Sequence, residues 1–212
     1  MKSILTLFLI IASTTAYSSV WTEGVAEKIS IASTLNCGEY PNIKSLQAKF
    51  ECESALLEIS NALYNGWLKT NKVERKEYLF CFWSKGNPKS ESFDEIFANP
   101  IVRLNIAALI GQLKRASSLT INIKEQREYA RAYISSSNNL VLVDSITALG
   151  WVGERKDLHI LLEIIQEEKE GIAENAVLSV INLLSNDYQS ILSKLSKSLK
   201  REPLQKFIEE RL

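Results

Sequence analysis

DSITALGWVGERKDLHILLEII (residues 144–165) and NAVLSVINLLSNDYQSILSKLS (residues 175–196) have nearly the same spacing of apolar residues. Superposing the two stretches places Ile146 on Val177, with a period of about 31 residues. An earlier stretch, NIAALIGQLKRAS (residues 105–117), matches the first half of this pattern. Repeats of this length are typical of helix pairs that stack side by side and present extended surfaces for binding proteins.

The preceding part of the chain also has helical periodicity. The apolar positions predict a helix over residues 43–64, with Asn42 as its N-cap. A turn near Gly66 and Trp67 and a further helix over residues 73–83 are predicted to follow it. The predicted core face of the first of these consists of Phe50, Ala55, Leu56, Ile59, Ala62 and Leu63.

Further helix boundaries can be placed from capping residues. Asn99-Pro100 predicts an N-cap and the first residue of a helix. Gly150 and Gly153 are expected to end the first helix of the first repeat, which should pair with the helix that follows it at residues 158–165. Pro203 fits the first turn of a last, short helix.

We therefore expect an all-α fold, in which a helical hairpin lobe is continuous with a short right-handed stack of helix pairs. The chain's 8 glycines and 4 prolines are few, which also favours helix. The clearest break is SKGNPKSES, and most aromatic residues precede it. The predicted organisation is a signal peptide over residues 1–16, an N-terminal helical lobe over 17–98 and helical repeats over 99–212.

The N-terminal sequence MKSILTLFLIIASTTAYSSV is typical of a secretory signal peptide. Lys2 is followed by an apolar run at residues 4–12, which is too short to span a membrane as a helix. Small residues allow cleavage after Ala16, with Ser18 as an alternative. We expect an exported protein, periplasmic or secreted, with no membrane insertion after cleavage.

Three cysteines, Cys37, Cys52 and Cys81, could form disulfides in an exported protein. Cys52 and Cys81 are about equally far from the predicted turn at Gly66 and Trp67, and such residues face each other in an antiparallel hairpin. The prediction is a Cys52–Cys81 disulfide; Cys37 could instead pair with Cys52 or with another molecule. Zinc is not expected, because the chain has one histidine and no C-x-x-C pair.

Composition and motifs give no sign of catalysis. Lys plus Arg and Asp plus Glu both number 25, so the net charge does not favour binding to nucleic acid or to an anionic membrane. Nucleophile-elbow, zinc-protease and phosphate-loop motifs are missing from the sequence. The only histidine, His159, has Glu163 one helical turn away, as in an ordinary surface pair. We expect no catalytic residue, cofactor or metal.

Residues 139–200 resemble HEAT-like repeats. The stretch ITALGWVGERKDLHILLEII is similar to the frequent family pattern ALG…G…D…LLEIL, although the second copy lacks the glycine. The resemblance implies stacked helix pairs that bind proteins on a concave face built from their second helices.

Residues 37–113 are similar to exported immunity proteins of the Tai type, which neutralise amidase toxins delivered by type VI secretion. The chain departs from that family where a glycine-rich piece and a final cysteine are expected, the latter near Ser117 or Ser118. The matching positions are Cys52, Cys81, Pro88, Asn99-Pro100 and Ala107-Ala108-Leu109.

Two groups of residues are candidates for binding a protein partner. Trp67 at the predicted hairpin tip and Trp151 at a corner between helices could anchor an interface. A basic stripe of Lys194, Lys197, Lys200 and Arg201 would suit an anionic partner, or is simply the solvent face of an amphipathic helix.

These observations predict a non-catalytic exported protein that binds another protein as an interaction or adaptor module. The alternative is a periplasmic immunity protein that inhibits a secreted toxin enzyme by occlusion.

Overall fold

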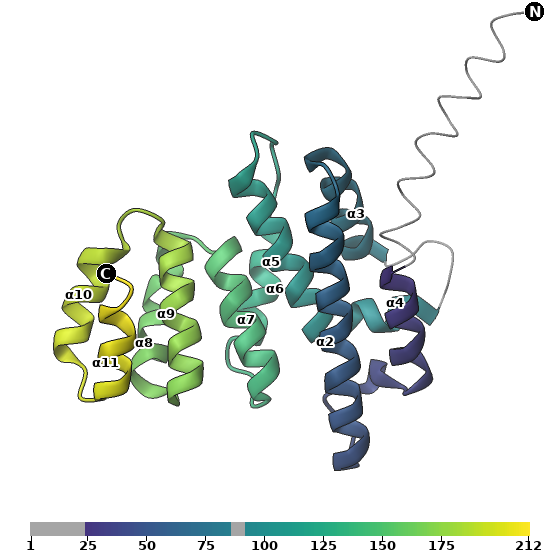
Figure 1. The fold of residues 1–212 in the computed structure, drawn as a ribbon, viewed down its shortest axis with the longest axis horizontal. Coiled ribbons are helices and arrows are strands. Elements are labelled where there is room, and N and C mark those ends of the chain that lie inside the picture. The colour runs from purple at the N-terminus through teal and green to yellow at the C-terminus, as the bar shows by residue number, and fades with distance from the viewer. Residues whose placement is uncertain (1–23, 86–91) are drawn as a thin grey trace, which may run out of the picture. The chain divides into compact units, whose positions relative to one another are not determined.

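The computed structural model describes residues 24–85 and 92–212, and the regular elements in these ranges are all helical (Figure 1). The all-α prediction is therefore confirmed. The chain divides into two compact units, with the boundary between Val102 and Arg103 inside one helix. The expected signal peptide lies outside the described residues.

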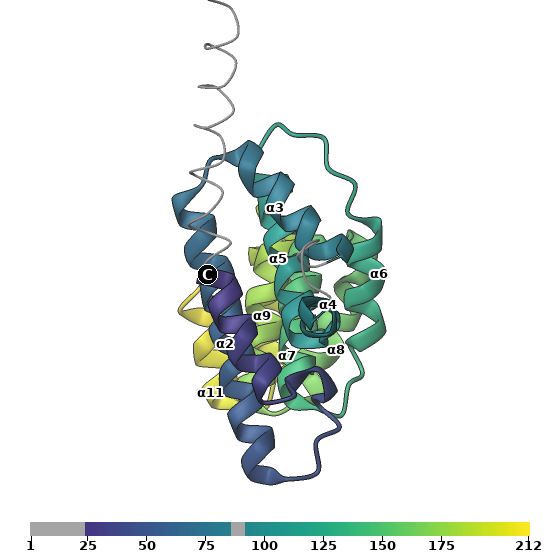
Figure 2. The same cartoon turned by 90° about the vertical axis from the view of Figure 1, so that its right-hand side faces the viewer.

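The first unit begins with a helix over residues 24–34, which lies beside α2 (Figure 2). Its core is apolar and largely aromatic at the α3–α4 contact, where the rings of Phe82 and Phe97 stack with centroids 5.0 Å apart. The other elements are η1 (Cys37–Glu39), α2 (Leu46–Lys69), α3 (Lys72–Lys85), α4 (Ser92–Ala98) and the start of α5 (Pro100–Ala116).

The boundaries of α2 differ from the prediction at both ends. Ser45, not Asn42, caps its N-terminus, with the Ser45 hydroxyl oxygen accepting a hydrogen bond from the amide of Ala48. The helix continues past Gly66 to Lys69. After α2 ends, Asn71 caps the N-terminus of α3. The Asn71 side chain accepts a hydrogen bond from the amide of Glu74, and the Glu74 carboxylate accepts one from the amide of Asn71.

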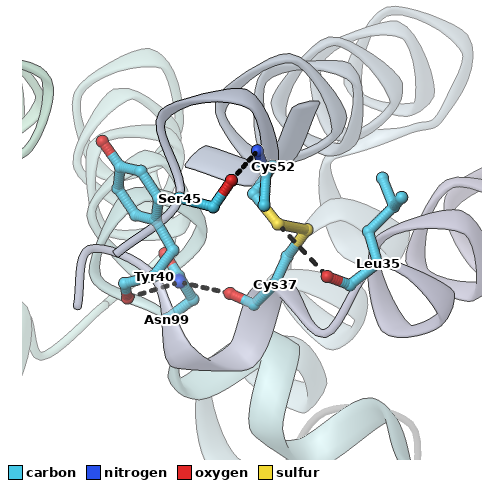
Figure 3. The surroundings of a disulfide bond; sticks show 7 residues. Leu35, Cys37, Tyr40, Ser45, Cys52 and Asn99 are labelled. Atoms are coloured by element: carbon cyan, nitrogen blue, oxygen red, sulfur yellow. Dashed lines mark hydrogen bonds between the residues drawn. A yellow bond between two sulfur atoms is a disulfide. The ribbon is translucent and has the colours of Figure 1, made fainter. Parts of the chain in front are cut away.

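The predicted Cys52–Cys81 disulfide is wrong. The disulfide joins Cys37 to Cys52, with their Cα atoms 5.2 Å apart (Figure 3). The reason is the true position of the turn: with its centre at Thr70 and Asn71, Cys81 is about eight residues, or roughly 12 Å of helix, out of step with Cys52. The short η1 turn instead carries Cys37 to the first turns of α2.

Asn99 fixes the start of α5, as predicted. Its side-chain oxygen accepts a hydrogen bond from the amide of Ile101 at 3.0 Å, and its side-chain nitrogen donates to the carbonyls of Cys37 and Tyr40, both at 3.1 Å (Figure 3). The side chain is buried. One amide therefore caps a helix and also holds the loop that carries the disulfide.

The second unit consists of helices that pack in pairs and stack (Figure 1). The pairs are α6 with α7, α8 with α9 and α10 with α11; in addition α7 packs on α9, and α9 on α11. Beyond α5, the elements are α6 (Lys124–Tyr133), α7 (Asn139–Val152), η2 (Arg155–Asp157), α8 (Leu158–Glu167), α9 (Glu170–Leu184), α10 (Tyr188–Ser198) and α11 (Glu202–Glu209).

The pairing differs from the prediction, which joined the helices now seen as α7 and α8. Helix α8 packs chiefly on α9, because only Glu168 and Lys169 separate these two helices, and so short a connection makes them antiparallel neighbours. Gly153 ends α7, as expected, but Gly150 lies inside that helix. Pro203 lies in the first turn of α11, as predicted.

Candidate protein-binding surfaces

Helix α2 has two apolar faces. One face packs into the core of the first unit through Cys52, Leu56, Ile59 and Leu63. The other face carries five large apolar side chains that are between 42% and 85% exposed. We call them the α2 stripe: Leu46, Phe50, Leu57, Tyr64 and Leu68.

The stripe is a straight line along the helix. At 3.6 residues per turn, its five positions fall within an arc of about 40°. Phe50 was predicted to lie in the core, because it matched the helical period of the apolar residues around it; it is in fact exposed. Polar residues such as Ser54 and Asn61 lie between Phe50, Leu57 and Tyr64, so the line is interrupted twice. Large exposed apolar side chains gathered on one face are nevertheless typical of interaction sites in soluble proteins.

An open groove of about 320 Å³ borders the N-terminal half of the stripe. It lies between the helix over residues 24–34 and α2, and its apolar lining includes Ile31, Leu35, Phe50 and Ala55. Charged groups, Lys28, Glu51 and Glu58, also line it. The groove widens the apolar surface next to Phe50.

Trp67 is not the exposed hairpin tip that the sequence predicted. It is 8% exposed, and the Arg75 guanidinium lies 4.5 Å from the centre of its ring. The cause is again the extension of α2: Trp67 lies in the last turn of the helix and faces the core. Its neighbour Leu68 is the exposed residue at this end.

Trp151 lies in the last turn of α7 and is half-buried. The Arg115 guanidinium lies 5.2 Å from the centre of its ring and donates hydrogen bonds to the carbonyls of Gly150, at 2.9 Å, and Asn182. Arg115 therefore links the C-terminal ends of α7 and α9, and Trp151 belongs mainly to this packing.

The three lysines of the predicted basic stripe are exposed. Lys194 and Lys197 lie on α10, and Lys200 follows it. Arg201, the fourth residue of the predicted stripe, does not belong to this exposed group: its guanidinium donates to the carbonyls of Ile165 and Glu168 at the C-terminal end of α8.

A partly buried ion-pair network around the buried Asp157, which was not predicted from the sequence, connects α6 to the segment between α7 and α8. Arg131 binds Asp157 through two hydrogen bonds of 2.8 and 3.0 Å, and Arg127 binds Glu154 and the carbonyl of Val152. Burial by itself raises the pKa of Asp157, but hydrogen bonds from Arg131 and from the amide of Glu154 outweigh it and lower that pKa. The network is structural, because every member has a partner inside it.

Asp144 on α7 is a half-buried carboxylate. Burial raises its pKa to about 7, against the opposing effect of a hydrogen bond with Asn105 of α5. Its Oδ2 atom is buried without a hydrogen-bond partner among the described residues. Such a group weakens the folded state when it is ionised.

His159 is exposed, with Nδ1 2.6 Å from the carbonyl of Lys156. Within residues 24–85 and 92–212, no group of three or more His, Cys, Asp or Glu side chains could hold a metal ion. In the same ranges, no helix has the length and hydropathy needed to cross a membrane.

Comparison with known proteins does not assign a family. No protein-family model matches the chain, and neither a curated protein nor a solved structure shows significant similarity to it. The interpretation of the surfaces therefore depends on their geometry.

Proposed function

We propose that this chain is an exported, non-catalytic module that binds a protein through the α2 stripe. The observation that carries the proposal is the line of exposed apolar side chains from Leu46 to Leu68, on the face of α2 opposite the core. A soluble protein that leaves such a line in water loses solubility, and covering it with a partner recovers roughly 25 cal/mol for each Å² removed from water.

The repeat unit is proposed to be a short HEAT-like stack. The packing of α6 on α7, α8 on α9 and α10 on α11, with α7, α9 and α11 in succession, supports this arrangement. In this view the stack is a scaffold, and Trp151 and the lysines of α10 are secondary contacts at most.

Export is proposed from two features of the first unit's sequence and structure. The signal-like start of the chain predicts it, and the Cys37–Cys52 disulfide is of a kind that persists in oxidising compartments.

Inhibition of a toxin enzyme is the narrower alternative. It rests on the resemblance to Tai-type immunity proteins, in which Cys52 and Cys81 are two of the matching positions. In this structure Cys52 pairs with Cys37 and not with Cys81. A plug formed by Trp67 is not available, because that ring is buried. An inhibitor would have to use the stripe instead.

Site-specific photo-crosslinking tests the proposal. We would replace Tyr64 with p-benzoylphenylalanine in the producing cells, irradiate them, and identify adducts by mass spectrometry. Asn65 is the matched control, because it is exposed on the same helix turn but lies about 80° away from the stripe's centre. A protein adduct at Tyr64 and none at Asn65 is the expected result. Equal adducts at both positions, or no adduct at Tyr64 or at Phe50 when Phe50 is replaced in the same way, would show that the stripe binds no protein.

The same experiment separates the candidates. An adduct with a toxin-like hydrolase would favour the inhibitor, and an adduct with an envelope component would favour the adaptor.

A further inference from the structure

The α2 stripe is symmetric along the helix. Leu46 and Leu68 lie eleven residues before and after Leu57, and Phe50 and Tyr64 lie seven residues before and after it. A helix that turns end over end about Leu57 therefore presents the same line of large apolar side chains.

This symmetry identifies a partner. We infer that the stripe binds a second copy of this chain, with the two α2 helices antiparallel and a two-fold axis passing beside Leu57; this inference rests on the proposed function. In this arrangement Leu57 contacts its own copy, Phe50 contacts Tyr64 of the second chain, and Leu46 contacts Leu68 of the second chain. Each contact occurs twice, as an isologous interface requires.

The exposed area fits a small dimer interface. The five stripe residues and Ile31, which lines the groove beside Phe50, are each at least 42% exposed. At about 100 Å² of apolar surface for each such side chain, two copies would bury roughly 1,200 Å², the lower end of the range for specific interfaces. The stripe itself consists of uncharged residues. Glu53, which lies between Phe50 and Leu57 about 40° from the stripe's centre, already has a partner, because its carboxylate accepts a hydrogen bond of 2.7 Å from the Tyr40 hydroxyl.

The flanking charges make a prediction that is specific to self-pairing. Glu51 and Glu58 lie on one side of the stripe. The two-fold axis keeps this side of both helices together, so that Glu58 lies beside its own copy. Glu58→Gln should therefore tighten the dimer at low ionic strength, because it removes a like-charge pair.

Cysteine crosslinking tests the register. In residues 17–212 with Cys81→Ser, Leu57→Cys should form a covalent dimer under mild oxidation. Leu68→Cys should not, because in the antiparallel pair the two copies of residue 68 are about 33 Å apart. Leu46→Cys and Leu68→Cys mixed together should crosslink. Crosslinking of Leu68→Cys alone as efficiently as Leu57→Cys would overturn the antiparallel pairing.

Sedimentation equilibrium on the same chain without introduced cysteines tests the pairing itself. We expect a dimer, a Kd raised at least 100-fold by Leu57→Glu, and no change with the control Leu178→Glu, which replaces an exposed leucine of α9 in the second unit. A monomer at concentrations up to about 50 µM would overturn the inference. That result would leave the proposed function to the photo-crosslinking experiment, where an adduct at Tyr64 with a different protein would still support it.

Discussion

Gly150 of α7 lies against Ser179 of α9 so closely that a Cβ atom on the glycine would be 2.8 Å from the serine Cα atom. Gly111 of α5 lies in the same way against Trp151 of α7, where a Cβ atom would be 2.8 Å from the backbone carbonyl carbon. In the two apolar patterns that contain a glycine, that glycine is therefore the point at which one helix approaches the next.

Replacing these glycines should separate the helices. Gly150→Ala is expected to lower the free energy of unfolding by about 2 kcal/mol, because the clash with the α9 backbone outweighs the better helix propensity of alanine. Gly171→Ala is the matched control: it lies in the first turn of α9, has no atom within 4 Å of its would-be Cβ, and should gain about 0.5 kcal/mol. Urea denaturation measures both, and equal effects would contradict the role of Gly150.

Among the acidic residues of the second unit, Asp157 is the one whose replacement should lower the free energy of unfolding most. Asp157→Ala leaves Arg131 without its bidentate partner, and we expect a loss of about 3 kcal/mol in unfolding free energy. The exposed Asp187, 3.0 Å from Arg155, is the control, and its replacement by alanine should cost less than about 1 kcal/mol. A loss of similar size in both variants would show that burial of the network is unimportant.

The same carboxylate should make the protein sensitive to acid. Because the folded-state pKa of Asp157 is lowered, its contribution is present above the pKa of an unfolded aspartate and is lost as the pH falls through the folded-state value. The difference in stability between the wild type and Asp157→Asn should therefore shrink on acidification. A difference that is constant with pH in chemical denaturation would argue against this account.

Asp144 should affect the pH dependence of stability in the opposite direction from Asp157. Its pKa is raised from 3.8 to about 7, so its favourable state is the protonated one, and stability is lost as the pH rises through this window. Asp144→Asn should stabilise the protein at pH 8 by on the order of 2 kcal/mol, and should have little effect near pH 3.5. Denaturation curves at both pH values check this, and an equal or smaller stability of the variant at pH 8 would contradict it.

The Cys37–Cys52 disulfide should stabilise the first unit, in which both cysteines lie. Replacing both Cys37 and Cys52 with serine should lower the free energy of unfolding by about 3 kcal/mol, because the disulfide closes a loop of 15 residues. The double variant should also lose the dependence of stability on reducing agent. Cys81→Ser should leave that dependence intact. Peptide mapping without reduction should find the Cys37–Cys52 pair; a Cys52–Cys81 peptide would contradict the structure.

Much of the architecture follows from local sequence. The all-α fold, the cap at Asn99, the end of α7 at Gly153 and the proline in the first turn of α11 were predictable, because helix periodicity and capping depend on residues close in the chain. Gly150 was expected to end a helix; its close approach to Ser179 of α9 was not predicted, because it depends on a helix far away in the sequence. The charged network around Asp157 was not predictable, because its arginines come from another helix.

Only the tertiary structure decided which residues face water and which cysteines meet. A shift of the α2–α3 turn by about four residues moved Trp67 into the core and gave Cys52 a different partner, since helical phase and reach change with every residue added. Phe50 has the same apolar character and nearly the same periodicity as its buried neighbours. The sequence by itself determined that this segment would be a helix rich in apolar residues. Because only one side of α2 packs on the core of the first unit, its other apolar face is exposed.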